Sequence, residues 1–99
     1  MRVRFLSGAK RELFEVRDRY EQIEQGLGNR FYLQVESAIA DLAQDPTRFP
    51  IHRWQVRRCL IKRFRYAVLF EVRSAEILIV AIMHTSRRPG YWKTRVAKK

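Results

Sequence analysis

Two segments with helical periodicity, separated by a glycine-rich break, restrict the fold of this chain more than any other feature. In the first segment the apolar residues at helical spacing are Ala9, Leu13, Val16, Tyr20 and Ile23. In the second they are Phe31, Val35, Ala38, Ile39 and Leu42. Side chains at intervals of three and four residues share one face of a helix. The pattern predicts two amphipathic helices that pack through facing apolar stripes as an antiparallel hairpin.

Polar and turn-forming residues indicate where these helices begin and end. Ser7 is a candidate N-cap for the first helix, and Asn29 is one for the second. The glycines of the segment 25–29 permit the positive φ that a helix C-terminus often needs. Pro46 predicts the end of the second helix, because the residue before a proline disfavours α-helical geometry.

The remaining residues have the patterns of strands and loops. A short strand is predicted at residues 3–6, and residues 49–54 are expected to form an irregular loop because Pro50 lies among them. Three further strands are predicted at residues 57–64, 66–72 and 77–83. The last is apolar throughout, so we expect it to be the central strand, covered on both faces. The short connections favour an antiparallel meander.

The predicted order is β-α-α-β-β-β, an α+β fold with the helical hairpin packed on one face of a mainly antiparallel sheet. A length of 99 residues suits one small domain, which we place at residues 1–99. No apolar run approaches the roughly 18 residues of a membrane span. The charged start of the chain does not suit a secretory signal, so we expect a cytoplasmic protein that makes no contact with a membrane.

The net charge of +11 is unevenly distributed. Residues 1–50 carry eight Lys or Arg and eight Asp or Glu, whereas residues 51–99 carry thirteen Lys or Arg against Glu71 and Glu76. Such asymmetry indicates a basic face with an acidic or polyanionic partner, although a merely solvated surface is also consistent with it. Two histidines and the lone Cys59 are too few for a zinc site, and Cys59 has the character of a small core residue.

Four motifs in the same order resemble those of the RelE/ParE toxin superfamily. They are GLGNRF at 26–31, PTRFP at 46–50, the pattern R-x-x-L-x-x-R-F-x-Y at 57–66, and A-I-x-H-x-x-R-x-P-x-x-W at 81–92. Arg65 stands where the third motif commonly has proline. The resemblance covers nearly the whole chain, and it is closer to the ParE branch than to the RelE branch.

The resemblance implies the toxin of a type II toxin–antitoxin system, silenced by a cognate antitoxin that is usually acidic in its C-terminal part. The ParE branch poisons DNA gyrase by binding it, whereas the RelE branch cuts mRNA on the ribosome without a metal. We expect the gyrase-binding toxin, with the ribosome-dependent endoribonuclease as the alternative. A larger toxin–antitoxin assembly is compatible with either, and neither requires a cofactor or metal.

The residues leave the question of catalysis open. A metal-free ribonuclease needs a base, cations around the phosphate and a proton donor. The candidates for these roles are Arg58, Lys62, His84, Arg87 and Tyr91. Glu71 is the one carboxylate near them in sequence, with no evident partner. A histidine that closes a buried strand is often structural.

The candidates for binding an antitoxin or target are Arg57, Arg58, Lys62, Arg63, Arg87, Arg88 and Trp92. The cations among residues 57–63 could bind acidic side chains, coat a phosphate backbone, or protect a sheet edge from aggregation. Trp92 could stack on bases or pin the C-terminal segment to the core. A plain nucleic-acid-binding module is a third hypothesis, although no recognition-helix pattern supports it.

Overall fold

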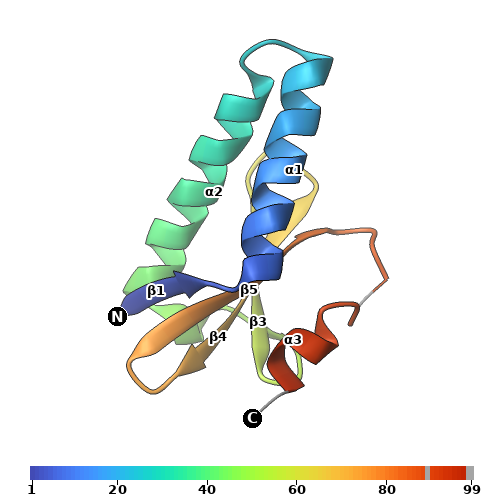
Figure 1. The fold of residues 1–99 in the computed structure, drawn as a ribbon. Coiled ribbons are helices and arrows are strands. Elements are labelled where there is room, and N and C mark those ends of the chain that lie inside the picture. The colour runs from blue at the N-terminus through green and yellow to red at the C-terminus, as the bar shows by residue number, and fades with distance from the viewer. Residues whose placement is uncertain (89, 98–99) are drawn as a thin grey trace.

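The computed structural model describes residues 1–88 and 90–97 and has a helical hairpin on one face of a five-stranded sheet (Figure 1). The elements in chain order are β1 (Arg2–Phe5), α1 (Ser7–Ile23), α2 (Leu27–Gln44), a 3-10 turn (Pro46–Arg48), β2 (Ile51–Arg53), β3 (Val56–Leu60), β4 (Tyr66–Arg73), β5 (Glu76–His84) and α3 (Lys93–Ala97). The predicted α+β architecture is confirmed. Pro89, which belongs to the fourth motif, lies outside the described residues.

The strand order across the sheet is β1-β5-β4-β3-β2. β1 pairs with β5 in parallel, and the other neighbours are antiparallel, as the short connections predicted. The expectation that residues 77–83 form the central strand is corrected, because β4 holds the middle position. β5 is nevertheless internal and buried on both faces. The register of β4 and β5 shifts between Leu69 and Phe70, which pair with Ala81 and Ile79 and leave Val80 as a bulge.

The segment from 49 to 64 differs from its predicted structure. Residues 51–53, expected to be irregular, form the edge strand β2, which turns into β3 through positive φ at Trp54 (48°) and Gln55 (70°). Such a two-residue turn matches the twist of a hairpin. β3 ends at Leu60 rather than at 64, because Arg63 (φ 69°) turns the chain and the amide of Ile61 donates to the carbonyl of Tyr66 (2.9 Å).

The helix caps also differ from the predicted ones. Ser7 is the first residue of α1, and Leu6 occupies the N-cap position. α2 begins after Gly26 (φ 88°), not after Asn29. The carboxylate of Glu21 on α1 accepts the backbone N–H groups of Gly26 (2.8 Å) and Gly28 (3.0 Å). This side chain satisfies amide donors that the start of a helix leaves without an intrahelical partner. α2 ends at Gln44, just before Pro46, as predicted.

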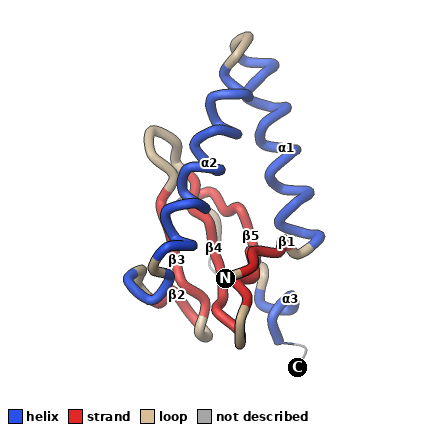
Figure 2. Tube along the Cα trace, turned by 90° about the vertical axis from the view of Figure 1, so that its left-hand side faces the viewer, coloured by secondary structure: helices blue, strands red, loops and turns tan. Residues whose placement is uncertain are grey.

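Both faces of the sheet are covered. The hairpin packs on one face, where Phe31, Val35, Cys59, Phe70 and Ile79 are among the buried residues. The burial of Cys59 confirms it as a core residue, and burial raises the pKa of its thiol to about 11. On the other face Trp92 and Val96 of the C-terminal segment cover Leu69, Val80 and Ala81. The tip of the hairpin projects beyond the sheet (Figure 2).

Gly28 lies where α2 packs tightly against α1. A Cβ at this position would lie 2.4 Å from the carbonyl oxygen of Arg17, a backbone atom that cannot move without separating the helices. We expect Gly28→Ala to lower the free energy of unfolding by about 2 kcal/mol, since overpacking outweighs the better helix propensity of alanine. Urea denaturation measures the effect. Asn29→Ala, an exposed neighbour, is the control, and an equal result for both variants would contradict the close approach.

Candidate functional site

The cations of the first predicted middle strand do not form one surface. Arg57 and Arg58 alternate along β3, opposite Phe70 and Leu69, which belong to the two different core layers. The guanidinium of Arg57 donates to the carbonyls of Thr47 (3.2 Å) and Phe49 (2.6 Å), so it holds the loop before β2. Arg58 lies on the opposite face of the sheet.

Four of the predicted binding residues are exposed cations outside regular strands. Lys62 and Arg63 lie in the β3–β4 turn, and Arg87 and Arg88 follow β5. The guanidinium carbon of Arg87 stands 3.9 Å from the ring centroid of Tyr91. Such cation–π contact holds the side chain beside the C-terminal segment.

Trp92 is fully buried, with 0% of its surface exposed. Its ring packs edge-on against Trp54 (5.6 Å between centroids) and tilted against His52 (5.9 Å). This burial corrects the prediction of Trp92 as an antitoxin- or target-binding residue, because no partner reaches the ring unless the segment opens. The alternative role, pinning the C-terminal segment to the core, is confirmed.

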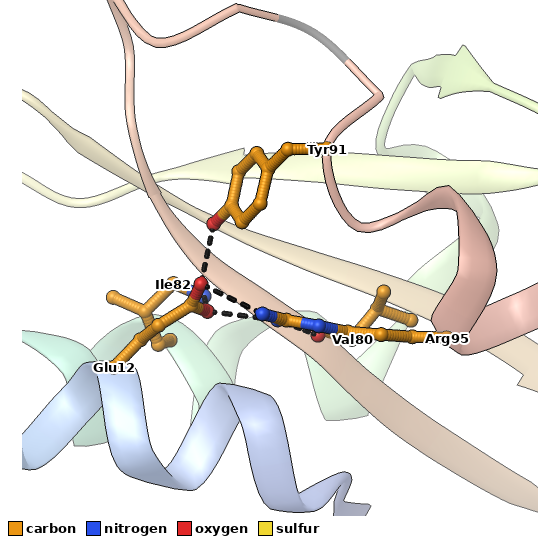
Figure 3. Close-up of polar contacts among 5 residues, drawn as sticks. All are labelled: Glu12, Val80, Ile82, Tyr91 and Arg95. Carbon is orange, nitrogen blue, oxygen red and sulfur yellow. Dashed lines mark hydrogen bonds and ion pairs between the residues drawn. The ribbon is translucent and has the colours of Figure 1, made fainter.

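Glu12 of α1 fastens the C-terminal segment to the bulge of β5 (Figure 3). Its carboxylate pairs with both guanidinium nitrogens of Arg95 (3.0 Å each) and accepts the hydroxyl of Tyr91 (2.7 Å) and the amide of Ile82 (3.1 Å). Arg95 also donates to the carbonyl oxygen of Val80 (3.0 Å). β1 ends at Phe5, opposite Ile79, so the ion pair satisfies strand groups that have no neighbouring strand there.

Burial and the carboxylate of Glu12 together shift the pKa values of Tyr91 and Arg95. Burial raises the pKa of the Tyr91 hydroxyl, and the hydrogen bond to Glu12 raises it further. Burial would lower the pKa of Arg95, but the hydrogen bond and charge of Glu12 raise it overall. Tyr91 is therefore a neutral donor whose proton is committed to Glu12.

His84 is the last residue of β5, and it lines a cleft of about 420 Å³ between α1 and the sheet. Its Nδ1 accepts the backbone amide of Ser86 (3.1 Å) and lies 2.7 Å from the Ser86 hydroxyl. A backbone N–H can only donate, so Nδ1 is the acceptor and the neutral ring carries its proton on Nε2. The ring meets Tyr66 edge-on at 5.0 Å between centroids.

Glu71, the carboxylate near the candidate residues in sequence, is buried and has a partner. Its Oε1 accepts the Nε of Arg73 at 3.0 Å and forms an ion pair with the same guanidinium at 2.9 Å. The expectation that Glu71 lacks a partner is thus corrected. Two residues apart on one strand, these side chains share a face of the sheet, a pairing that period-2 alternation would have predicted.

A larger and mostly apolar groove of about 760 Å³ runs between β1, α1 and α2. The side chains that line it are Val3, Arg4, Phe5, Lys10, Leu13, Phe14, Tyr32, Val35, Glu36, Ile39, Ala40 and Ala43. β1 is the end strand of the sheet, so the outer edge of its backbone has no neighbouring strand among the described residues. An open strand edge beside an apolar groove is suited to binding a peptide segment.

The described residues contain neither a cluster of potential metal ligands nor a helix that could span a membrane. Across 1–88 and 90–97, no three His, Cys, Asp or Glu side chains are grouped so that they could hold a metal ion. None of the described helices is long and apolar enough to cross a bilayer.

Comparison with known proteins identifies the family. Residues 3–89 match the family described as ParE toxin of type II toxin-antitoxin system, parDE. The chain belongs to the ParE toxin family. The fold is similar to that of a chain in a solved structure of the chromosomal ParDE TA system from P. aeruginosa, with a TM-score of 0.75 and 20% sequence identity over 85% of this chain and 95% of that one. No protein of curated function matches the sequence.

In this ParE-family chain, three of the five predicted catalytic residues lie together. His84 and Arg87 line one cleft, and the Tyr91 hydroxyl is bound to Glu12, which lines the same cleft. Arg58 lies on the opposite face of the sheet, and Lys62 lies in the β3–β4 turn. Sequence reasoning missed Glu12 and Arg95, which are 83 positions apart. Glu12 carried one available signal, because it lies three residues after Ala9 and four before Val16 and so places a carboxylate on the apolar side of α1.

Proposed function

We propose that this chain inhibits growth by binding DNA gyrase, that it acts in the cytoplasm by binding and not by catalysis, and that a cognate antitoxin neutralises it. Binding without catalysis is supported by the hydrogen bonds of the two candidate acid–base residues, His84 and Tyr91. Nδ1 of His84 accepts the amide of Ser86, and the hydroxyl of Tyr91 donates its proton to Glu12. A general base needs a free lone pair, and a general acid needs a transferable proton.

Charge separation supports the same choice. A ribonuclease collects its cations around one scissile phosphate. Here Arg58 and His84 lie on opposite faces of the sheet, and Arg57 is committed to two loop carbonyls. Lys62, Arg63 and Arg88 are exposed to solvent, and exposed cations favour association with an acidic protein partner.

The groove between β1, α1 and α2 is the proposed docking surface for the antitoxin. Most of its lining residues are apolar, and its charged residues are the cations Arg4 and Lys10 and the carboxylate Glu36. A segment with apolar residues and flanking carboxylates would bury the former and pair the latter with these cations. The free edge of β1 would allow the same segment to continue as an added strand.

Two reactions run in parallel test binding against catalysis. The purified chain is added to ribosomes carrying mRNA and, at the same concentrations, to gyrase with supercoiled DNA. We expect intact mRNA at concentrations that trap gyrase on cleaved DNA. Cleavage of ribosome-bound mRNA with no effect on gyrase would overturn the proposal in favour of the endoribonuclease.

A further inference from the structure

We propose that the cleft between α1 and the adjoining ends of β4 and β5 binds a carboxylate side chain of a protein partner. The inference rests on the proposed function in one respect, namely that the partners of this chain are proteins. The residues that carry it are Arg19 of α1, Tyr66 of β4, His84 of β5 and Arg87. The cleft adjoins a second hollow that Arg19, Tyr66 and His84 also line.

The polar groups of this cleft are hydrogen-bond donors. Arg19 donates to the hydroxyl oxygen of Tyr66 (3.3 Å), which leaves the proton of that hydroxyl available to a ligand. Since Ser86 occupies Nδ1 of His84, the neutral ring offers an Nε2–H. Arg87 is exposed at the cleft and adds a second guanidinium.

The acceptors within the cleft do not match these donors. The carboxylate of Glu12 already receives Arg95, Tyr91 and the amide of Ile82. Glu15 is exposed on α1, one turn from Arg19. A ligand that supplies acceptor oxygens with a negative charge would complete this donor set, since charge-assisted hydrogen bonds are roughly twice as strong as neutral ones.

The surroundings favour a single carboxylate over a nucleic-acid backbone. Glu15 lines the cleft and Asp18 precedes Arg19, so a string of phosphates passing along α1 would meet two carboxylates. Arg58, which would have to extend a phosphate track across the sheet, lies on the other face of the sheet. Nucleic-acid binding depends on many phosphate contacts in a row.

The cleft is separate from the proposed antitoxin groove. Lys10, Leu13 and Phe14 of α1 line the groove, whereas Glu15, Val16 and Arg19 line the cleft. A partner in the groove would have to pass over α1 to reach the cleft. The carboxylate can therefore come from an extension of the antitoxin or from the target, and the two sources require separate tests.

Titration of the isolated, isotope-labelled chain tests the site without either partner. The probes are N-acetylglutamate N-methylamide, a carboxylate in a peptide setting, and dimethyl phosphate, a model of the nucleic-acid backbone, both at constant ionic strength. We expect saturable shifts of the NMR signals of the Arg19 Nε–H and the His84 ring nitrogens with the carboxylate. A dissociation constant on the order of millimolar is expected for one charge-assisted contact set.

Arg19→Gln should weaken carboxylate binding by about tenfold, because it removes the cation but keeps a polar side chain that can donate hydrogen bonds. Arg11→Gln, an exposed position on the same helix, is the matched control and should leave the constant unchanged. The amide spectrum of each variant reports whether the fold is intact. Linear shifts that never saturate, an equal response in Arg19→Gln, or binding of dimethyl phosphate at least as tight as that of the carboxylate would overturn the proposal.

Measuring how the same two variants bind the antitoxin and gyrase shows which of these proteins supplies the carboxylate. A loss confined to one partner assigns the carboxylate to that partner. Loss with neither partner would overturn the proposed role even if the small probe binds. Because the titration uses no gyrase, failure of the gyrase proposal would leave its result in place and so can be distinguished from failure of the cleft.

Discussion

Replacing Glu12 with alanine should lower the free energy of unfolding by about 3 kcal/mol and release the C-terminal segment from the sheet. The side chains of Glu12 and Arg95 keep only 13% and 19% of their surface exposed. Without the carboxylate, the guanidinium of Arg95 loses its counter-charge, and the Tyr91 hydroxyl and Ile82 amide lose their acceptor. Urea denaturation gives the stability. Hydrogen exchange at the Ile82 amide reports the opening directly, and it should become much faster.

Two further variants decide whether the loss arises from the ion pair. Glu15→Ala, on the exposed side of the same helix, is the matched control and should change stability by less than about 0.5 kcal/mol. Adding Arg95→Leu to Glu12→Ala should recover part of the loss, because an unpaired buried charge costs more than an apolar side chain of similar size. If Glu12→Ala is no worse than Glu15→Ala and leaves the Ile82 amide protected, the ion pair does not hold the segment.

Antitoxin binding should be weakened strongly by a charge introduced into the groove. Ala40 is exposed on α2 and lines the groove between β1, α1 and α2. Ala40→Glu should weaken the complex with the cognate antitoxin by 100-fold or more, which is about 2.7 kcal/mol. The new carboxylate would lose its hydration against apolar groups and repel an acidic partner. Isothermal titration calorimetry with the purified antitoxin measures the constant.

Ser37→Glu provides the comparison for the groove. It makes the same charge change three residues away on α2, on an exposed position that lines a different hollow. We expect it to leave the affinity within about threefold of the original, since surface changes outside a contact alter binding little. Equal losses in both variants would indicate a general charge effect, and unchanged binding in Ala40→Glu would place the antitoxin elsewhere.

The sequence predicted those parts of the fold that depend on local patterns. The spacing of the apolar residues from Ala9 to Ile23 located the first helix, and Pro46 located the end of the second. Burial of Cys59 followed from its chemistry, and attachment of the C-terminal segment to the core was one of the two roles expected of Trp92. β2 was missed because its turn uses positive φ at Trp54 and Gln55, residues that rarely adopt it, so no Asn-Gly or Asp-Gly pair signals a hairpin.

The site was less predictable, because its contacts join residues that are distant in sequence. Glu12 meets Arg95 only after the chain has formed the sheet and returned, and no local rule connects the two. The cap of α2 comes from Glu21 on the neighbouring helix for the same reason. The basic residues 57 and 58 looked like one surface, but strand alternation sends them to opposite faces. The sequence shows how many basic residues this segment has, but it does not show which of them share a face of the sheet.

We propose that this ParE-family chain acts on gyrase by binding it. To test this, the purified chain is added to gyrase, ATP and supercoiled plasmid, and the DNA is separated on a gel after the protein has been denatured. We expect linear DNA that accumulates with the amount of the chain and disappears when the antitoxin is added first. Supercoiled DNA that stays intact at a molar excess of the chain over gyrase would contradict the proposal.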